Sequence, residues 1–336
     1  MSTAILRFSA LGDVAMTVPV ISSAAHHNPT ERFVVVTRKS FCALYEELNP
    51  NVNILPADLK GNHKGIIGLW RLARTLKKQY NVDKVADLHN VLRTKVLRFF
   101  LNLMGCQTAH IHKGRREKRR LVKRGWKKSV PLTKQTKRYA EVFKELSFAC
   151  PEDFSVQTYP APKLLPKLHR ESLKIGVAPA SAHSCKTYPQ DKLRKVLVSL
   201  LENKEATLFF FGKEHDVKKA ATELSKSFPD RVFLASSIAK DLREELGLMQ
   251  QLDAMLSMDS ANMHLAALTG LRVISIWGAT HPYAGFLAYG AKASDCIQSP
   301  RACRPCTIYG AHPRCKAPFP CLEDIKEEHI YQSLLK

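Results

Sequence analysis

Three residues that follow a short apolar run could bind an anionic ligand. Asp259 and Ser260 come directly after Leu252–Met258, a run fit for a buried strand, and His264 stands one helical turn beyond Ser260. A helix that begins here offers free backbone N–H groups and the positive end of its dipole, for which a diphosphate is a natural guest. The alternative is structural: Asp259 and Ser260 only cap the helix, and His264 packs in the core. The residues alone leave both interpretations open.

Two further charged residues lie where a strand turns into a helix. Lys186 stands just before the helix expected over Gln190–Leu201, where helix stability needs no cation, so it could contact a phosphate. Asp13 ends the turn after the first strand, at the crevice edge where ligands bind in open α/β sheets. For both residues the alternative is structural, a surface lysine and an aspartate in the first turn of a helix.

Strands and helices alternate through most of the chain. The expected strands are Ala4–Ser9, Phe33–Thr37, Val52–Leu55, Val82–Asp87, Lys174–Ala178, Ala206–Phe211, Val232–Leu234, Leu252–Met258 and Arg272–Trp277. The expected helices are Val14–His26, Ser40–Leu48, His63–Tyr80, Val91–Leu103, Tyr139–Phe148, Gln190–Leu201, Ala239–Gln250, Asn262–Thr269 and Leu322–Leu335. This order predicts parallel sheets with helices on both faces. The turns at 181–186, 212–214 and 259–264 should then face one crevice.

The length of 336 residues suggests about two domains. Pro151–Pro166 contains four prolines and is the best linker in the chain. We therefore expect a first domain over residues 1–165 and a second from residue 166.

The net charge of +22 indicates an anionic partner: nucleic acid, an anionic lipid surface or a phosphorylated substrate. Residues 112–138 form the most basic stretch, which we expect to be a long loop. It could be a solvated surface, a clamp on phosphates, or a patch on an anionic membrane into which Trp126 dips. No helix-turn-helix, zinc-finger or RNA-recognition signature stands beside it, so we do not expect nucleic acid.

The N-terminus has no signal-peptide pattern, and no run reaches the ~18 apolar residues that cross a bilayer. We therefore expect a cytoplasmic protein with reduced thiols. Cys303, Cys306, Cys315 and Cys321 lie within nineteen positions and include one CxxC pair. They could hold a structural zinc ion. Buried reduced cysteines or a redox-labile pair are the alternative.

Three segments carry a family resemblance. ILRFSALGDVAMTVPVI, APASAHSCKTYP and MDSANMHLAALTGLRVISIWGATHP occur in this order and resemble signatures of glycosyltransferase family nine, the lipopolysaccharide heptosyltransferases. The resemblance covers most of the chain. It implies a GT-B fold, with two Rossmann-like doubly wound domains facing across a cleft. The first would bind the acceptor and the second, residues 166–320, the nucleotide sugar. Residues 321–336 would form a helix that packs back on the first domain.

The resemblance also implies an activity. It is the inverting, metal-independent transfer of heptose from ADP-heptose to a lipopolysaccharide core acceptor of the Kdo/lipid A type, at the cytoplasmic face of the inner membrane. Asp13 would be the general base and Lys186 would contact the diphosphate. Other implied donor-binding residues are Ser181, Glu214, Asp259, Ser260, Ala261 and His264. The acceptor would contact Gly12 and Asp13, and the basic stretch suits its anionic groups through Arg115, Arg116, Arg119 and Arg120.

The chain departs from the family pattern at a few positions. Asp259-Ser260-Ala261 stands where the family commonly has Asp-Thr-Gly, and Met263 replaces the serine before the histidine. Ser260 keeps the hydroxyl, whereas Ala261 narrows the space that a glycine would leave. These changes affect the prediction of the donor sugar more than the prediction of the fold. Another nucleotide-sugar donor, a family member kept only for binding, and a basic nucleic-acid-binding protein are the alternatives.

Overall fold

The structure is a computed structural model that describes residues 2–163, 166 and 172–336. The chain divides into two compact units: unit 1 contains Met1–Lys113 and Lys134–Ser155, and unit 2 contains Gly114–Thr133 and Val156–Lys336. The change of unit after Ser155 lies ten residues before the predicted boundary at 165. Residues 164 and 165 themselves lie outside the described residues. The linker residues from Val156 onward belong to unit 2, where Gln250 binds Gln157 O at 2.7 Å and the Tyr159 N–H at 2.8 Å.

Unit 1 contains a five-stranded parallel sheet in the order β3-β2-β1-β4-β5. Its strands are β1 (Ser2–Leu6), β2 (Arg32–Thr37), β3 (Val52–Pro56), β4 (Val82–Asp87) and β5 (Gln107–His110). β1 lies between β2 and β4, pairing Leu6 with Val36 and with Asp87. The β-branched run of β2 is buried on both faces, as a strand covered by helices on both sides requires.

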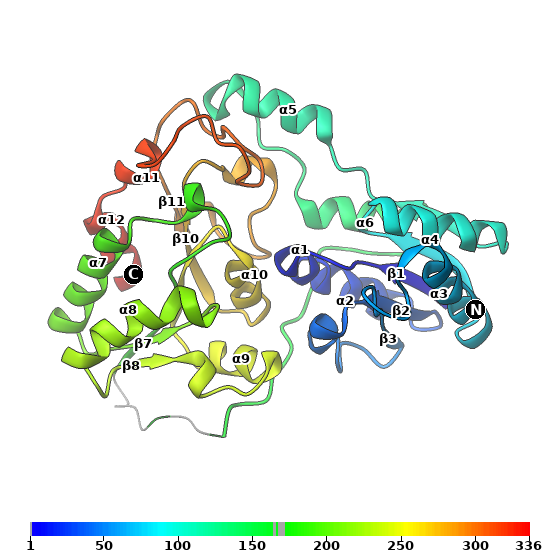
Figure 1. The fold of residues 1–336 in the computed structure, drawn as a ribbon, viewed down its shortest axis with the longest axis horizontal. Coiled ribbons are helices and arrows are strands. Elements are labelled where there is room, and N and C mark those ends of the chain that lie inside the picture. Colours follow the sequence, from blue (N-terminus) through cyan, green and yellow to red (C-terminus); the bar gives the residue numbers. More distant parts are fainter. Residues whose placement is uncertain (1, 164–165, 167–171) are drawn as a thin grey trace. The chain divides into compact units, whose positions relative to one another are not determined.

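The helices of unit 1 are α1 (Leu11–Ala15), α2 (Val18–His27), α3 (Gly65–Gln79), α4 (Leu92–Leu103) and α6 (Gln135–Glu145), with a 3₁₀ helix over Lys39–Leu44. The helix predicted over Val14–His26 is two helices, because Pro19 lacks an N–H and fits only the first turn of α2. α3 and α4 lie side by side (Figure 1) and share a core with the sheet through Leu72 and Leu97. α6 contacts α2, β4 and β5.

Unit 2 contains a six-stranded parallel sheet in the order β11-β10-β9-β6-β7-β8. Its strands are β6 (Leu173–Ala178), β7 (Ala206–Phe210), β8 (Val232–Leu234), β9 (Ala254–Met258), β10 (Arg272–Trp277) and β11 (Cys296–Gln298). Counted within the unit, this is the order 3-2-1-4-5-6 of a dinucleotide-type α/β fold. The alternation of strands and helices that the sequence predicts is therefore confirmed in both units.

The helices of unit 2 are α5 (Arg115–Arg124), α7 (Gln190–Asn203), α8 (Glu214–Ser227), α9 (Leu242–Met249), α10 (Ala261–Leu268), α11 (Pro320–Glu323) and α12 (Glu327–Leu335). α12 packs against α7 (Figure 1), and Ile330 and Leu334 join the same core as Leu197. Residues 321–336, which were expected to pack back on the first domain, belong to unit 2, and the apolar face of α12 is buried in the core of that unit. Among the described helices, none is long and apolar enough to span a membrane.

The basic stretch 112–138 differs from its prediction as a loop. Most of it is α5, a 3₁₀ turn over Trp126–Lys128 and the start of α6. α5 buries Lys118 and Leu121, and residues 114–133 belong to unit 2 although they precede the linker.

Candidate active site

The unit 2 sheet has a topological switch point between β6 and β9. From β6 the chain continues to β7 on one side, and from β9 it continues to β10 on the other, so the loops beyond these two neighbouring strands diverge. Ligands of open α/β sheets bind at such a switch point. Ser181 and Asp259 lie just beyond the two strands, and the Ser181 hydroxyl donates to the main-chain oxygen of Asp259 at 3.3 Å. The structure thus brings together two of the three predicted turns, 181–186 and 259–264.

Lys186 and Asp259 form an ion pair at this point, with 3.1 Å between Nζ and Oδ2. Their side chains are only 13% and 9% exposed, so the pair is little screened by solvent. Asp259 Oδ2 also accepts a hydrogen bond of 2.7 Å from Thr280, which lies beyond β10. The carboxylate therefore orients a cation at the crevice, where the ammonium can also reach a phosphate oxygen.

α10 begins at the same place. Ser260 is its N-cap residue, with φ −145° and ψ 178°, but its side chain makes no capping hydrogen bond; Ser260 Oγ lies 3.3 Å from Ser257 Oγ instead. The purely capping interpretation of Ser260 is therefore wrong. Ala261 is the first residue of α10. His264 is 7% exposed on the packed side of the helix, which favours the core interpretation over a direct ligand contact.

The remaining predicted turn, 212–214 after β7, reaches α10 through its backbone. Asn262 donates to Phe211 O at 3.3 Å, and Gly212 follows with φ +143°, a conformation that favours glycine. Glu214 begins α8 on this side of the sheet, yet it is 70% exposed and pairs with Lys218 at 3.0 Å. The structure places Glu214 at the same sheet edge as the crevice without joining it to the Lys186–Asp259 pair.

Arg304 fixes the loop after β10. It is 1% exposed, and its guanidinium donates to the main-chain oxygens of Trp277, Gly278, Thr280 and Ser299 and to Gln298 Oε1, over 2.6–3.1 Å. These acceptors are neutral, and burial lowers the pKa of Arg304 to about 10. Gly278 approaches the β6 loop so closely that a Cβ there would lie 2.3 Å from Cys185 O. Arg304 therefore positions Thr280 against Asp259.

Asp13 lies at the equivalent position of unit 1, beyond β1 and in the first turn of α1, as predicted. The side chain is 31% exposed, and its Oδ2 lies 2.5 Å from the guanidinium of the buried Arg7. Arg7 also donates to Leu88 O at 2.7 Å, which ties the β1 loop to the loop after β4. Tyr139 approaches both residues: its hydroxyl is 3.5 Å from Asp13 O, and its ring is 5.7 Å from the Arg7 guanidinium.

His89 completes this edge of unit 1. It follows β4, and its Nδ1 accepts a 3.4 Å hydrogen bond from the Phe8 N–H. Burial, followed by the positive charge of Arg7 and of other nearby cations, lowers the pKa of His89 to about 3. The imidazole is therefore neutral at physiological pH and adds no charge beside the Arg7–Asp13 pair.

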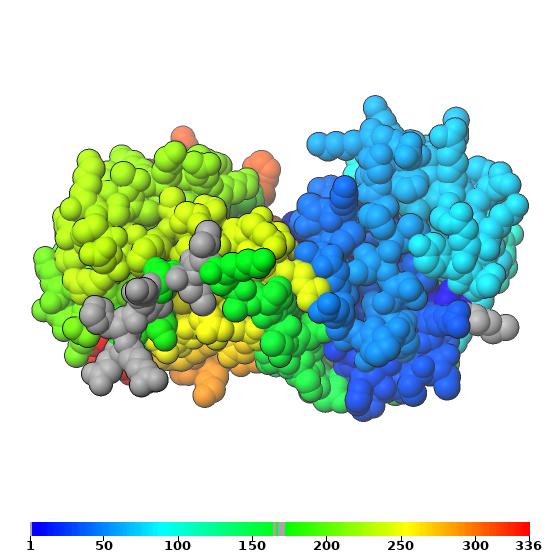
Figure 2. Space-filling view, turned by 90° about the horizontal axis from the view of Figure 1, so that it is seen from below, coloured from blue at the N-terminus to red at the C-terminus, as the bar shows by residue number. Residues whose placement is uncertain are grey.

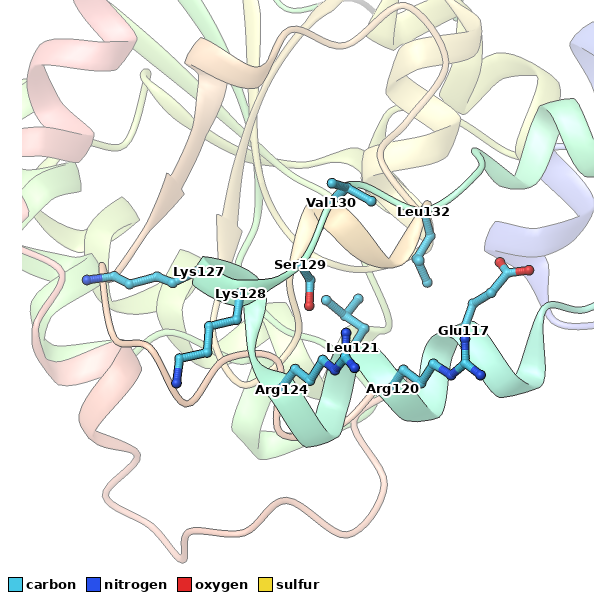
Figure 3. Close-up of a pocket in the computed structure, with 9 residues that line it drawn as sticks. All are labelled: Glu117, Arg120, Leu121, Arg124, Lys127, Lys128, Ser129, Val130 and Leu132. Carbon is cyan, nitrogen blue, oxygen red and sulfur yellow. The ribbon is translucent and has the colours of Figure 1, made fainter.

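The basic segment 114–133 forms a pocket of about 490 Å³. Figure 3 shows α5 on one side and residues 129–132 on the other, with Leu121 and Ser129 pointing toward one another. The lining residues are Glu117, Arg120, Leu121, Arg124, Lys127, Lys128, Ser129, Val130 and Leu132. Four cations and one carboxylate make it suited to an anionic group. Among the four arginines predicted to bind the acceptor, Arg120 lines this pocket, and Arg115, Arg116 and Arg119 are exposed elsewhere on α5.

This segment is firmly attached to later parts of unit 2. Trp126 stacks on His281 with 5.1 Å between ring centroids, and its indole N–H donates to Arg301 O at 2.9 Å. Lys118 Nζ lies 4.4 Å from the centroid of the Phe286 ring. The expectation that these arginines belong to the N-terminal domain is therefore wrong, and Trp126 has one ring face and its N–H engaged within unit 2.

The four clustered cysteines do not form a zinc site in the structure. Cys303 and Cys315 are exposed, whereas Cys321 is buried. In the described part of the chain, no group of three or more His, Cys, Asp or Glu side chains could hold a metal ion. The arrangement of Cys303, Cys306, Cys315 and Cys321 therefore does not fit the four-thiolate site that the spacing suggested.

Sequence reasoning missed several residues of these sites. Arg7 carried a signal, because a charged residue at the end of an apolar strand needs a buried partner. Thr280 and Arg304 carried none, since their roles depend on which backbone oxygens surround them. His89 could have been suspected from its place directly after a predicted strand.

Residues 69–314 match the model of a family described as glycosyltransferase family 9 (heptosyltransferase). The lipopolysaccharide core heptosyltransferase OpsX of Haemophilus influenzae is 28% identical over 96 residues, which are 29% of this chain and 26% of that protein. The match thus spans about a quarter of the length of this curated relative. Asp13 precedes the residues that match the family model.

Two solved proteins resemble nearly the whole chain. A glycosyltransferase family 9 protein from Veillonella parvula is 18% identical, with a TM-score of 0.71 over 99% of this chain and 97% of that chain. The Escherichia coli heptosyltransferase WaaC is 18% identical over 99% and 98% of the two chains, with TM-scores of 0.66 for its structure with ADP and 0.64 with ADP-2-deoxy-2-fluoro heptose. These likenesses confirm the predicted fold class of two Rossmann-like domains.

Proposed function

Because the chain belongs to glycosyltransferase family 9, the heptosyltransferase family, we propose that it transfers a heptose from ADP-heptose to a lipopolysaccharide core acceptor of the Kdo/lipid A type. The observation that carries the proposal is the Lys186–Asp259 pair at the switch point of the unit 2 sheet, beside the start of α10. A diphosphate-linked donor is the ligand class that this arrangement suits. Its use of ADP is supported by the ADP and ADP-2-deoxy-2-fluoro heptose complexes of the structurally similar WaaC.

Departure of the nucleoside diphosphate is the step that unit 2 assists. As the bond from the anomeric carbon to the diphosphate breaks, negative charge grows on the phosphate oxygens. Lys186 donates to those oxygens, together with the first N–H groups of α10. Ser181, Ser260 and Ala261 line the approach of the donor. Charge stabilisation by these groups is what makes the transfer independent of a metal ion in this proposal.

Asp13 is the general base of the proposed reaction. A sugar hydroxyl has a pKa far above 7, so it attacks the anomeric carbon only when a base takes its proton. Attack from the face opposite the leaving diphosphate inverts the configuration at that carbon. Asp13 Oδ2 faces Arg7, so we assign the proton to Oδ1, and Gly12 leaves room for the acceptor beside it.

The acceptor's phosphates and carboxylates suit the basic segment 114–133. Arg120, Arg124, Lys127 and Lys128 line its pocket, and Arg115, Arg116 and Arg119 extend the positive charge along α5. Since such a glycolipid is held in a membrane, the protein would work as a peripheral protein at the cytoplasmic face of the inner membrane. Another nucleotide-sugar donor is the second candidate, supported by Ser260-Ala261 in place of Thr-Gly. Nucleic-acid binding has only the net charge in its favour.

A thermal-shift panel with ADP, ADP-heptose, UDP, GDP and random DNA tests the donor class. We expect ADP and ADP-heptose to raise Tm, and Lys186→Met to lose most of that rise. Stabilisation by UDP or GDP instead would transfer the proposal to another donor, and stabilisation by DNA alone would overturn it. Turnover of ADP-heptose with a Kdo-containing acceptor, with and without EDTA, then tests the transfer and its independence of metal.

A further inference from the structure

Large apolar side chains are exposed together on two neighbouring helices of unit 1. On α3 they are Ile66, Ile67 and Trp70, and on α4 they are Leu92, Phe99 and Leu103, which we call the apolar patch. They are six of the nine large apolar residues that are exposed among the described residues, with exposed fractions from 40% to 78%. Single exposed apolar residues are ordinary, whereas a gathering of this kind marks an interaction site.

Aromatic rings connect the two helices that carry the apolar patch. The ring centroid of Trp70 on α3 lies 5.3 Å from that of Phe100 on α4, and Phe100 lies 5.9 Å from Phe99. The two helices adjoin on the face of unit 1 drawn in Figure 2, where their atoms are light blue and cyan. The patch is therefore shared by both helices.

Only positive charge surrounds the apolar patch on these helices. α3 and α4 contain no Asp or Glu. Their exposed cations are Arg71, Arg74, Lys78, Arg93 and Lys95. A second copy docked on the same face would bring equal charges together, which disfavours a symmetric dimer through this surface. An anionic surface with an apolar interior complements both features.

We propose that the apolar patch docks unit 1 on the surface of an anionic lipid bilayer. Ile66, Ile67 and Phe99 would enter the boundary between headgroups and acyl chains, and the cations would remain among the phosphates. Trp70 suits this depth because its ring is apolar and its indole N–H can face water. The binding itself needs no transferase activity, but its purpose rests on the proposed function.

The position of the apolar patch on unit 1 relates the proposed docking to the proposed catalytic base. α3 and α4 follow β3 and β4, so both helices begin at the carboxyl edge of the unit 1 sheet, the edge at which Asp13 follows β1. Ile66, Ile67 and Leu92 lie at these helix starts. Docking there would put the proposed base at the edge of unit 1 that is near the membrane. This place differs from Trp126, where the sequence suggested that a membrane would be touched.

Vesicle flotation of the whole protein tests the proposal. Phosphatidylcholine vesicles with 30% phosphatidylglycerol are compared with pure phosphatidylcholine vesicles, without acceptor or nucleotide. We expect Ile66→Ser/Ile67→Ser and Phe99→Ser each to weaken binding to the anionic vesicles at least tenfold with an unchanged Tm. Val130→Ser, an equally exposed apolar residue beside the basic pocket, is the matched control and should bind like the parent protein.

Trp70 reports the docking directly. Brominated phosphatidylglycerol should quench its fluorescence, and Trp70→Phe should remove that part of the quenching, because Trp277 is buried and Trp126 is stacked on His281.

Unchanged flotation of both patch variants would overturn the proposal. A loss in Val130→Ser alone would transfer the contact to the basic segment, and lipid-free dimers abolished by the patch variants would assign the patch to a second copy. Flotation without heptose transfer would contradict the proposed function while leaving the docking intact.

Discussion

The guanidinium of Arg7 lies 2.5 Å from the carboxylate of Asp13, and Arg7 is buried whereas Asp13 is partly open to solvent. The arginine directly follows the central strand β1, so the backbone that ends the strand also fixes the direction of the carboxylate. A substrate hydroxyl can approach Asp13 only from the side that Arg7 leaves open. The pair therefore connects the fold of unit 1 to the proposed proton transfer.

We expect Asp13→Asn to fold and bind ADP as the parent protein does, but to lose turnover by about 10²–10⁴-fold, the usual contribution of general acid–base catalysis. The amide keeps the shape of the carboxylate and cannot take the proton. Steady-state transfer rates and the ADP thermal shift, measured on the same preparations, separate the two effects. Full activity in this variant would remove Asp13 from the mechanism.

The variants Arg7→Lys and Arg7→Met separate the contribution of the arginine's positive charge from that of its hydrogen-bond geometry. Lysine keeps a cation near Asp13, whereas methionine removes it and leaves Leu88 O without its donor. Loss of one partner of a buried, hydrogen-bonded charge costs about 1–3 kcal/mol, so Arg7→Met should lower the free energy of unfolding by that order. We expect Arg7→Lys to be more stable and more active than Arg7→Met, by urea unfolding and kcat. Equal values in the two variants would contradict an electrostatic role.

Lys186→Met should raise the Kd for ADP at least tenfold, because the ammonium that would meet the diphosphate is gone. Lys218→Met is the matched control, since Lys218 is also in a 3.0 Å ion pair but is 64% exposed. Isothermal titration with ADP and with adenosine makes the test specific: only the ligand with phosphates should lose affinity. If adenosine binding falls equally, Lys186 supports the fold of the loop and not the phosphate contact.

Replacing cations of the basic pocket by glutamate should weaken the binding of the acceptor and leave the binding of the donor unchanged. We expect Arg124→Glu and Lys128→Glu to raise KM for a phosphorylated acceptor about tenfold and to leave KM for ADP-heptose unchanged. Lys195→Glu on α7 makes the same change of charge on another exposed surface and controls for long-range effects. An equal response in Lys195→Glu would mean that the overall charge, and not the pocket, attracts the acceptor.

Acid should destabilise unit 2 through His281. Burial and then the charge of Arg304 lower its pKa to about 3, against an ordinary value of 6.5. The unfolded chain therefore binds a proton first, so this stability is present above pH 6.5 and is lost progressively between pH 6.5 and 3. The loss approaches about 1.4 kcal/mol per pH unit.

His281→Asn removes this titration while its side-chain oxygen can still accept from the Tyr283 N–H. Between pH 7 and pH 5, we expect urea unfolding of the parent protein to lose up to about 2 kcal/mol more than this variant. His329→Asn, at an exposed position on α12, should behave like the parent protein. Parallel pH profiles for all three proteins would contradict the linkage.

The sequence predicted the alternating architecture well because strands such as Phe33–Thr37 and Arg272–Trp277 are rich in β-branched and apolar residues and lie between polar turns. β5 and β11 were missed: QTAH and CIQ are short edge strands, and only pairing with β4 and β10 defines them. The helix over 14–26 was predicted without its break because its apolar spacing continues across Pro19. In each case the error lies where tertiary pairing or one residue overrides a local pattern.

The candidate site was predicted only in part. Asp13, Lys186 and Asp259 were each selected from their places beside strand ends, but their pairing with other residues depends on distant segments meeting. Arg304 is 45 residues from Asp259 in the sequence and acts on it through Thr280, which no local pattern reveals. The basic stretch was assigned to the first domain because it precedes the linker, whereas its contacts with His281 and Phe286 attach it to the second.

The chain changes unit three times, after residues 113, 133 and 155. A fragment cut at the linker and containing only residues 156–336 would therefore lack α5 and expose the faces of His281 and Phe286 that Trp126 and Lys118 cover. We expect such a fragment to aggregate in solution. The complementary N-terminal fragment would carry the cationic helix α5 without the surface on which α5 packs. Recombination between relatives should likewise succeed only when residues 114–133 are inherited together with residues 281–314.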